Sequence, residues 1–93
     1  NMYNRVGLVS GSAVVTDSSE SIFLPAIYAI DDPNPEITEI VSFEGLYGSL
    51  FKAEEEIKYK GILEKVEGKN PHQRVIIGGA GSPDNYIKWG HSG

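Results

Sequence analysis

The sequence predicts a mainly β fold with one short helix, arranged as a small curled sheet or an OB-like barrel. Three observations lead to this prediction. Short runs rich in Val, Ile and Tyr are separated by clusters of Gly, Pro, Asn and Ser, as in proteins built of short strands. The best helical periodicity lies in one short stretch. A long strand candidate has Gly61 near its middle, and a glycine there lets a strand turn the corner of a small barrel.

Length and composition narrow the choice further. The chain has 93 residues and no cysteine, so we expect one domain over residues 1–93, without disulfides or thiolate chemistry. Met2 is either a native start or an internal methionine of a longer chain. The absence of cysteine predicts a cytoplasmic protein. No apolar stretch approaches the ~20 residues that span a bilayer, which predicts that the chain does not enter the membrane. The net charge of −5 argues against non-specific nucleic-acid binding.

Strands are predicted along the first part of the chain. Residues 5–9 and 13–16 are expected to pair as a hairpin, with bends at the glycines within and between them. Residues 22–30 alternate as a strand does but also fit helical spacing. Pro25 favours the strand, with its first half at a sheet edge, although the helix stays open as an alternative.

The helix is predicted over residues 43–51, after a turn at 31–35 and a strand at 37–41. Ser42 stands at the expected N-cap, and five apolar residues share one stripe: Phe43, Leu46, Tyr47, Leu50 and Phe51. The opposite side is unusually bare and carries Gly45, Gly48, Ser49 and Lys52. Each glycine costs a helix about 0.5–1 kcal/mol relative to alanine. We therefore expect a partner to approach this face closely, with three candidate binding residues: Gly45, Gly48 and Lys52.

The second half is predicted to hold strands at residues 57–66, 74–77 and 86–89, with a turn over 67–71, which makes six or seven strands in all. A glycine loop follows the 74–77 strand, as phosphate-binding loops follow buried strands. It lacks the Gly-Lys-Ser/Thr that opens a helix in the Walker motif, so a connecting loop is the better interpretation. Its weak binding candidates are Gly79, Gly81 and Ser82.

The titratable residues predict no catalytic residue, no metal site and no cofactor. Asp31 and Asp32 are adjacent, so their side chains diverge in a rigid, solvated turn. The acidic run at residues 54–56 is expected to be a solvated junction at the end of the helix. His72 and His91 are expected to be exposed, with no carboxylate placed to orient either of them.

Aromatic residues beside lysines raise the alternative of a surface that stacks nucleic-acid bases. Tyr59 lies between Lys58 and Lys60, and Trp89 follows Lys88, so that each ring has a cation next to it. Tyr59 shares its face of the strand with other apolar residues, however. A position in the core is therefore the preferred interpretation of Tyr59.

Several short motifs resemble the C-terminal region of an archaeal family of predicted nucleotidyltransferases. The chain reads Glu-Ile-Val-Ser-Phe-Glu-Gly over residues 39–45 and Lys-Gly-Ile-Leu-Glu-Lys-Val over 60–66. Val-Ile-Ile-Gly at 75–78 and Tyr-Ile-Lys at 86–88 stand where the family has its last two strand motifs. The resemblance covers roughly residues 21–89.

The resemblance implies a nucleotidyltransferase whose catalytic pattern is not found in these 93 residues. That chemistry uses a Gly-Ser at a helix start and, a short distance on, an Asp-x-Asp/Glu pair that holds magnesium. Gly11 and Ser12 supply the first element, but only Asp17 follows at short range. We therefore expect a non-catalytic accessory domain that positions substrate or mediates self-association. Magnesium is implied only if an upstream catalytic domain exists.

Two alternatives stay open. One is a stand-alone oligomerising or ligand-binding protein that uses the glycine face of the helix or the glycine loop. The other, which is the least favoured, is a small independent enzyme using Asp31, Asp32 and His72. An upstream Gly-Ser…Asp-x-Asp pattern in the gene would favour the accessory domain, whereas a start codon at Met2 would count against it.

Overall fold

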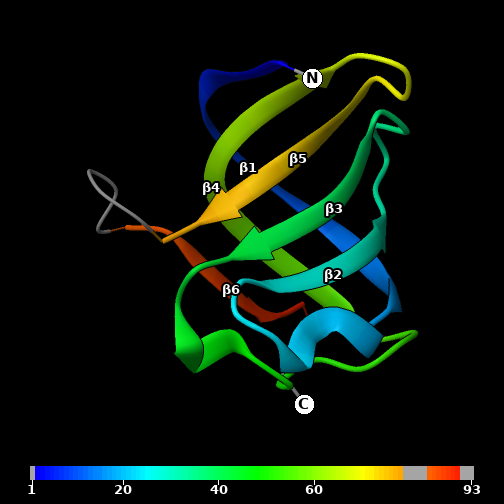
Figure 1. Cartoon of the computed structure of the whole chain (residues 1–93). Coiled ribbons are helices and arrows are strands. Elements are labelled where there is room, and N and C mark those ends of the chain that lie inside the picture. Colours follow the sequence, from blue (N-terminus) through cyan, green and yellow to red (C-terminus); the bar gives the residue numbers. More distant parts are fainter. Residues whose placement is uncertain (1, 79–83, 91–93) are drawn as a thin grey trace.

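The computed structural model describes residues 2–78 and 84–90, which form a β fold with two short 3-10 helices (Figure 1). In chain order the elements are β1 (Met2–Asp17), η1 (Ser19–Ile22), β2 (Ala26–Asp31), β3 (Ile37–Ser42), η2 (Gly45–Tyr47), β4 (Glu56–Glu67), β5 (His72–Ile77) and β6 (Tyr86–Trp89). The predicted mainly β class is confirmed.

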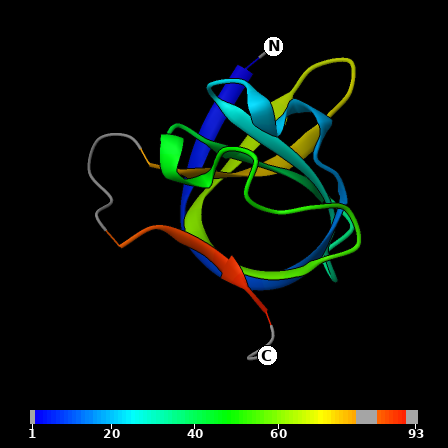
Figure 2. The same ribbon diagram turned by 90° about the horizontal axis from the view of Figure 1, so that it is seen from below.

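Five of the strands close into a ring in the order β1-β2-β3-β5-β4, because β1 also pairs with β4. Neighbouring strands of the ring are antiparallel, except β3 and β5, which are parallel. Figure 2 looks along this ring, and β6 joins the first half of β4 as an added strand. The arrangement agrees with the OB-like barrel that the sequence predicts.

The interior of the ring is filled by side chains from alternating positions on the strands. Tyr28 and Tyr59 are the largest of them and are almost completely buried, so the core position predicted for Tyr59 is confirmed. The buried cluster consists of Ala13, Val15, Tyr28, Ile30, Ile37, Ile40, Phe51, Ile57, Tyr59, Val75, Ile77 and Ile87.

The hairpin predicted for the first residues is wrong, because they form the single long strand β1. Gly11 does not make a turn. It lies inside the strand, where a Cβ atom would be 2.7 Å from the hydroxyl oxygen of Tyr59. Gly7, with φ of +152°, accompanies a shift of register against β4 between Arg5 and Gly7. The glycines therefore accommodate a close contact and a bulge rather than a chain reversal.

The strand predicted over residues 22–30 is confirmed only in its second half. Strand β2 begins directly after Pro25, and Ile22 belongs to η1. Proline has no N–H to contribute to a sheet, so pairing starts beyond it. The four other predicted strands are confirmed, with small changes at their ends, as β3, β4, β5 and β6.

The helix predicted over residues 43–51 is wrong. Only Gly45–Tyr47 makes one 3-10 turn, and Ser42 is the buried last residue of β3 rather than an N-cap. Phe43 and Leu46, two members of the predicted apolar stripe, are exposed. Two glycines within six residues weaken any helix here, and the remaining backbone groups find partners outside the segment.

The main partner outside the segment is the hydroxyl of Tyr28 on β2. It donates a hydrogen bond to the carbonyl oxygen of Tyr47. It also accepts from the backbone N–H groups of Leu50, at 3.0 Å, and Phe51, at 3.3 Å. The ring of Phe51 packs edge-on against Tyr28, with centroids 5.6 Å apart. Tyr28 thus holds the chain in an irregular path across one end of the barrel.

Strand β4 changes partner at Gly61, as the predicted corner requires. Before Gly61 it pairs with β6, and after it with β5, while β1 runs along its other edge. A Cβ atom on Gly61 would lie 2.4 Å from the carbonyl oxygen of Ile76 and 2.8 Å from a methyl of Val75. The two strands can approach this closely only because residue 61 has no side chain.

Gly61→Ala is expected to lower the free energy of unfolding by about 1–3 kcal/mol, because the added methyl group forces β4 and β5 apart. Urea denaturation followed by circular dichroism measures the change. Gly45→Ala is the matched control, since a Cβ atom there has no neighbour within 4 Å. Equal stability of the Gly61→Ala variant and the wild type would contradict the close approach.

Tyr28→Phe is expected to cost about 1–3 kcal/mol, because it leaves buried backbone groups of the crossing segment without a partner. Amide hydrogen exchange provides the specific readout, since protection should be lost at Leu50 and Phe51 while the sheet amides stay protected. Tyr3→Phe serves as the control, because the Tyr3 side chain is exposed. Unchanged exchange at both amides would show that the hydroxyl does not hold the segment.

Candidate docking surface

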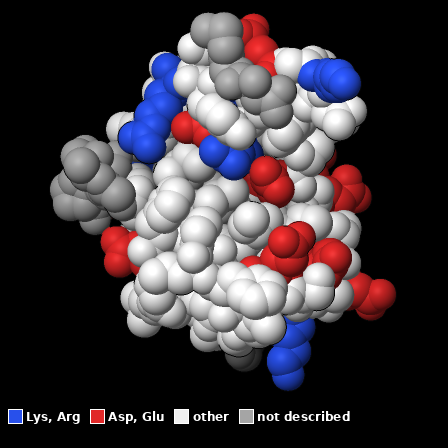
Figure 3. All heavy atoms as spheres, in the orientation of Figure 1, with Lys and Arg blue, Asp and Glu red and all other residues white. Residues whose placement is uncertain are grey.

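Five large apolar side chains are exposed on and beside the two 3-10 helices. Each has 50–75% of its surface accessible, and they are Ile22, Phe23, Leu24, Phe43 and Leu46. We call this set the apolar surface. In Figure 3 a broad region without charged side chains extends over the lower front of the molecule, where η1 and η2 lie, with acidic side chains at its sides and a basic side chain at its lower edge. Exposed apolar patches of this kind mark interaction sites in soluble proteins.

Three residues of the apolar surface, Ile22, Phe23 and Leu24, line a shallow groove between the two helices. Phe43 and Leu46 flank two further lining residues, Glu44 and Gly45, in the chain. The backbone N–H of Ser49 donates to the carbonyl oxygen of Ser21 at 3.0 Å, which fixes the η2 segment against η1. The groove has a volume of about 290 Å³. Its lining residues are Ser21, Ile22, Phe23, Leu24, Ala26, Glu44, Gly45, Gly48 and Ser49.

Gly45 and Gly48, which the sequence predicts to bind a partner from one face of a helix, both line this groove, although the helix itself does not form. Gly45 is open to solvent, whereas a Cβ atom on Gly48 would lie 3.3 Å from the carbonyl oxygen of Ser21. Lys52 does not line the groove, and its backbone N–H donates to the carboxylate of Glu55. Of the remaining candidates, Gly79, Gly81 and Ser82 lie outside the described residues.

A second apolar row crosses the outer side of the sheet, but its middle is covered, since Val41 and Ile76 are each only 2% exposed. Val41, two residues before Phe43, is paired with Ile27 on one side and Ile76 on the other. None of the three belongs to the interior cluster, so they lie on its opposite face. The register places one residue on each strand of the ring, in the order Ile27, Val41, Ile76, Ile62 and Leu8.

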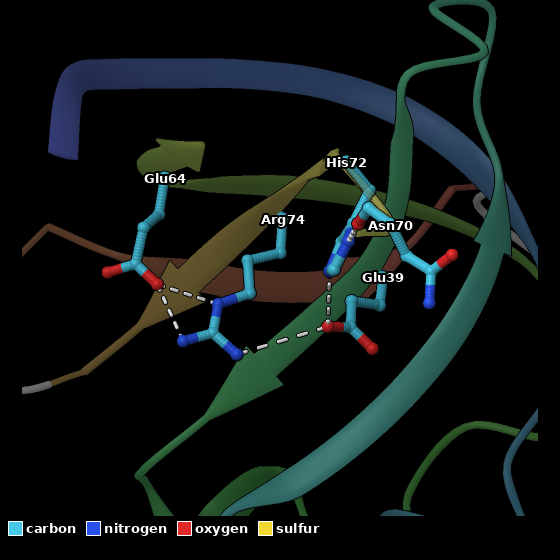
Figure 4. A network of polar contacts seen from close by, with 5 residues as sticks. All are labelled: Glu39, Glu64, Asn70, His72 and Arg74. Atoms are coloured by element: carbon cyan, nitrogen blue, oxygen red, sulfur yellow. Dashed lines mark hydrogen bonds and ion pairs between the residues drawn. The ribbon is translucent and has the colours of Figure 1, made fainter. Parts of the chain in front are cut away.

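A row of alternating charges runs beside the apolar row (Figure 4). Arg74 donates to the carboxylate of Glu64 through Nε at 2.7 Å and lies 2.6 Å from it through Nη2. Glu39, on the other side, is 4.0 Å from Arg74, and Arg5 is 3.5 Å from Glu64. The side chain of Glu64 is almost fully buried, with 7% of its surface accessible. These charges neutralise one another and make this part of the outer face structural.

His72 is tied into the same row, so the prediction of an exposed histidine without a carboxylate neighbour is wrong. Its Nε2 lies 3.5 Å from Glu39, and its Nδ1 is 2.8 Å from the carbonyl oxygen of Asn70 (Figure 4). The ring of Tyr3 covers the guanidinium group of Arg74 at 4.8 Å. The second predicted histidine, His91, lies outside the described residues. Local sequence offers no signal for the His72 contact, because β3 and β5 become neighbours only through the parallel pairing.

The two aspartates of the predicted solvated turn differ in the structure. Asp31 is exposed, whereas the carboxylate of Asp32 accepts a hydrogen bond from the hydroxyl of Tyr59. Burial raises the pKa of Tyr59, and the hydrogen bond and negative charge of Asp32 raise it further. The tyrosine therefore stays neutral and anchors the β2–β3 turn to the barrel interior.

The described residues contain no group of three His, Cys, Asp or Glu side chains that could hold a metal ion. In the acidic run at residues 54–56, Glu55 accepts hydrogen bonds from the backbone of Lys52 and from the indole N–H of Trp89. Trp89 also packs edge-on against Phe51, with centroids 5.0 Å apart. Within residues 2–78 and 84–90, no helix is long and apolar enough to cross a membrane.

Removing Arg74 alone is expected to destabilise the protein more than removing both Arg74 and its buried partner Glu64. Arg74→Met should cost about 3–5 kcal/mol, because it leaves Glu64 buried beside only the exposed Arg5. The double variant Arg74→Met/Glu64→Leu should recover most of that loss. Arg5→Met, at an exposed position, should change stability by less than about 1 kcal/mol. Thermal and urea unfolding of the variants would contradict the structural role if the double variant is the least stable.

Comparison with known proteins returned no match. No family model, curated protein or solved structure is significantly similar to this chain. The functional interpretation therefore depends on the surfaces described above and on the short motifs of the sequence.

Proposed function

We propose that the chain is a non-catalytic accessory β-barrel of a nucleotidyltransferase-type protein, and that its apolar surface docks the barrel onto a catalytic domain. The observation that carries the proposal is the exposure of five large apolar side chains on two neighbouring segments, three of which line a groove together with Gly45 and Gly48. Burying them in an interface would gain about 25 cal/mol for each square ångström removed from water.

The shape and charge of the apolar surface indicate what kind of partner fits. Gly45 presents bare backbone at the groove, so a partner side chain can approach closely. Glu44 lines the groove, and Glu20 lies in the first turn of η1, the helix that precedes the lining residues Phe23 and Leu24. A second copy of the same surface would oppose these carboxylates with carboxylates. A protein surface with apolar side chains and a margin of Lys or Arg is the complementary partner.

The polar groups of the barrel support a non-catalytic role. The charged row is paired within itself, and the carboxylate of Asp32 is engaged by Tyr59. Both ring nitrogens of His72 have partners, the carboxylate of Glu39 and the carbonyl oxygen of Asn70. This argues against a small independent enzyme that uses Asp31, Asp32 and His72. Positioning of substrate by the barrel would then be indirect, through the orientation of the docked catalytic domain.

The genomic sequence before Asn1 gives the first test, since the proposal expects an upstream Gly-Ser…Asp-x-Asp pattern. The segment that carries this pattern, produced separately, should bind the barrel in isothermal titration calorimetry. Leu46→Lys should weaken that binding at least about tenfold, because it replaces the most exposed side chain of the apolar surface by a charge that the interface would bury. Val6→Lys, on the exposed side of β1, is the matched control. A start codon at Met2, or binding that Leu46→Lys leaves intact, would contradict the proposal.

A further inference from the structure

Strand β1 has a partner on only one edge along most of its length. It pairs with β4 from Met2 to Val14, but β2 joins its other edge only from Val14 onward. In the part of the chain that the structure describes, no strand pairs with that edge over residues 2–13. A free edge of this length offers a row of backbone groups to another strand.

Hydrogen bonds at the end of β1 show which residues face the free edge. Val15 donates its N–H to the carbonyl oxygen of Glu55 and accepts from the N–H of Glu54, so both its backbone groups face the β4 side. The direction alternates along an antiparallel strand, so the same orientation holds for Ala13, Gly11 and Val9. The N–H and C=O groups that point to the free edge are those of Leu8, Ser10 and Ser12.

The free edge lacks the devices with which proteins normally block strand pairing. Edge strands are commonly protected by charged residues, especially Lys, or by Pro. β1 has neither from Val6 to Thr16, and its first charge before that segment is Arg5. Leu8 is 64% exposed at the end of the apolar row. A bulge between Arg5 and Gly7 bounds the free segment at its N-terminal end.

We infer that β1 pairs with β1 of a second copy of this chain, antiparallel and over residues 8–12. In a register centred on Ser10, Ser10 lies opposite its own copy and Leu8 lies opposite Ser12. The outward backbone groups of Leu8, Ser10 and Ser12 then form hydrogen bonds with Ser12, Ser10 and Leu8 of the second copy, respectively. The two-fold symmetry of this contact gives a closed dimer rather than an open chain of molecules.

Charge and space are compatible with this pairing. Lys60, the residue opposite Ser10 on β4, is the nearest cation in the ladder. In the dimer the two Lys60 residues are separated by three strand spacings, about 14 Å, which exceeds the screening length of about 8 Å at physiological salt. Val14, already paired with β2, would face Val6 of the second copy, and the bulge there lets the incoming strand leave the ladder.

Ser10→Pro tests the dimer directly. The N–H that proline removes points to the free edge, so the pairing of β1 with β4 loses no hydrogen bond. Sedimentation equilibrium up to about 1 mM chain should show dimer for the wild type and for the control Ser10→Ala, which keeps the N–H. Ser10→Pro should weaken the dimer at least about tenfold, because the symmetric contact loses a hydrogen bond from each chain.

Amide exchange of the wild type supplies a second readout that does not depend on the proline variant folding. Protection at Leu8, Ser10 and Ser12 should rise with chain concentration, whereas Val9 and Gly11 should be protected at every concentration. A wild type that stays monomeric at 1 mM chain overturns the inference. So does a dimer that survives Ser10→Pro but is lost in Leu46→Lys, which would place self-association on the apolar surface. That second outcome would not decide whether the apolar surface also docks a catalytic domain, which the calorimetric titration with the upstream segment tests separately.

Discussion

The closure of the barrel depends on the contact between β4 and β5 at Gly61. In the ring, β4 lies between β1, which pairs along the whole length of β4, and β5, which pairs only with its second half, while the added strand β6 takes the first half of that edge. The partner changes at Gly61, where the carbonyl oxygen of Ile76 occupies the space of a missing side chain. With that contact in place, β5 can also reach β3 in parallel and complete the ring. The position of every outer row of side chains follows from this arrangement.

The apolar surface is a consequence of how one end of the barrel is covered. A regular helix over residues 43–51 would have turned Phe43 and Leu46 towards the core together with Phe51. Tyr28 instead holds the crossing segment by its backbone, and only Phe51 enters the interior fully. Phe43 and Leu46 remain exposed, as do Ile22, Phe23 and Leu24. Exposed apolar clusters of this kind commonly mark interaction sites, and this is the observation behind the proposed docking role.

The charged row, the apolar surface and the free edge of β1 occupy different parts of the barrel. The charges of Arg5, Arg74, Glu39 and Glu64 neutralise one another in a row that stabilises the neighbouring strands. The apolar surface lies at the η1 and η2 end, whereas the free edge belongs to the first half of β1. Because these two regions involve different elements, the proposed docking and the inferred pairing of two copies would not compete for the same residues.

The sequence by itself determined the class of fold, most of the strands and the role of Gly61, because these depend on local alternation and on a residue that lacks a side chain. It also pointed to Gly45 and Gly48, although on a helix that does not form. Only the tertiary structure decided that residues 43–51 cross the barrel without a helix, that residues 2–17 form one strand, and that Asp32 and His72 have partners. Each of these depends on groups far away in the chain, such as the hydroxyls of Tyr28 and Tyr59. Local periodicity carries no information about such distant contacts.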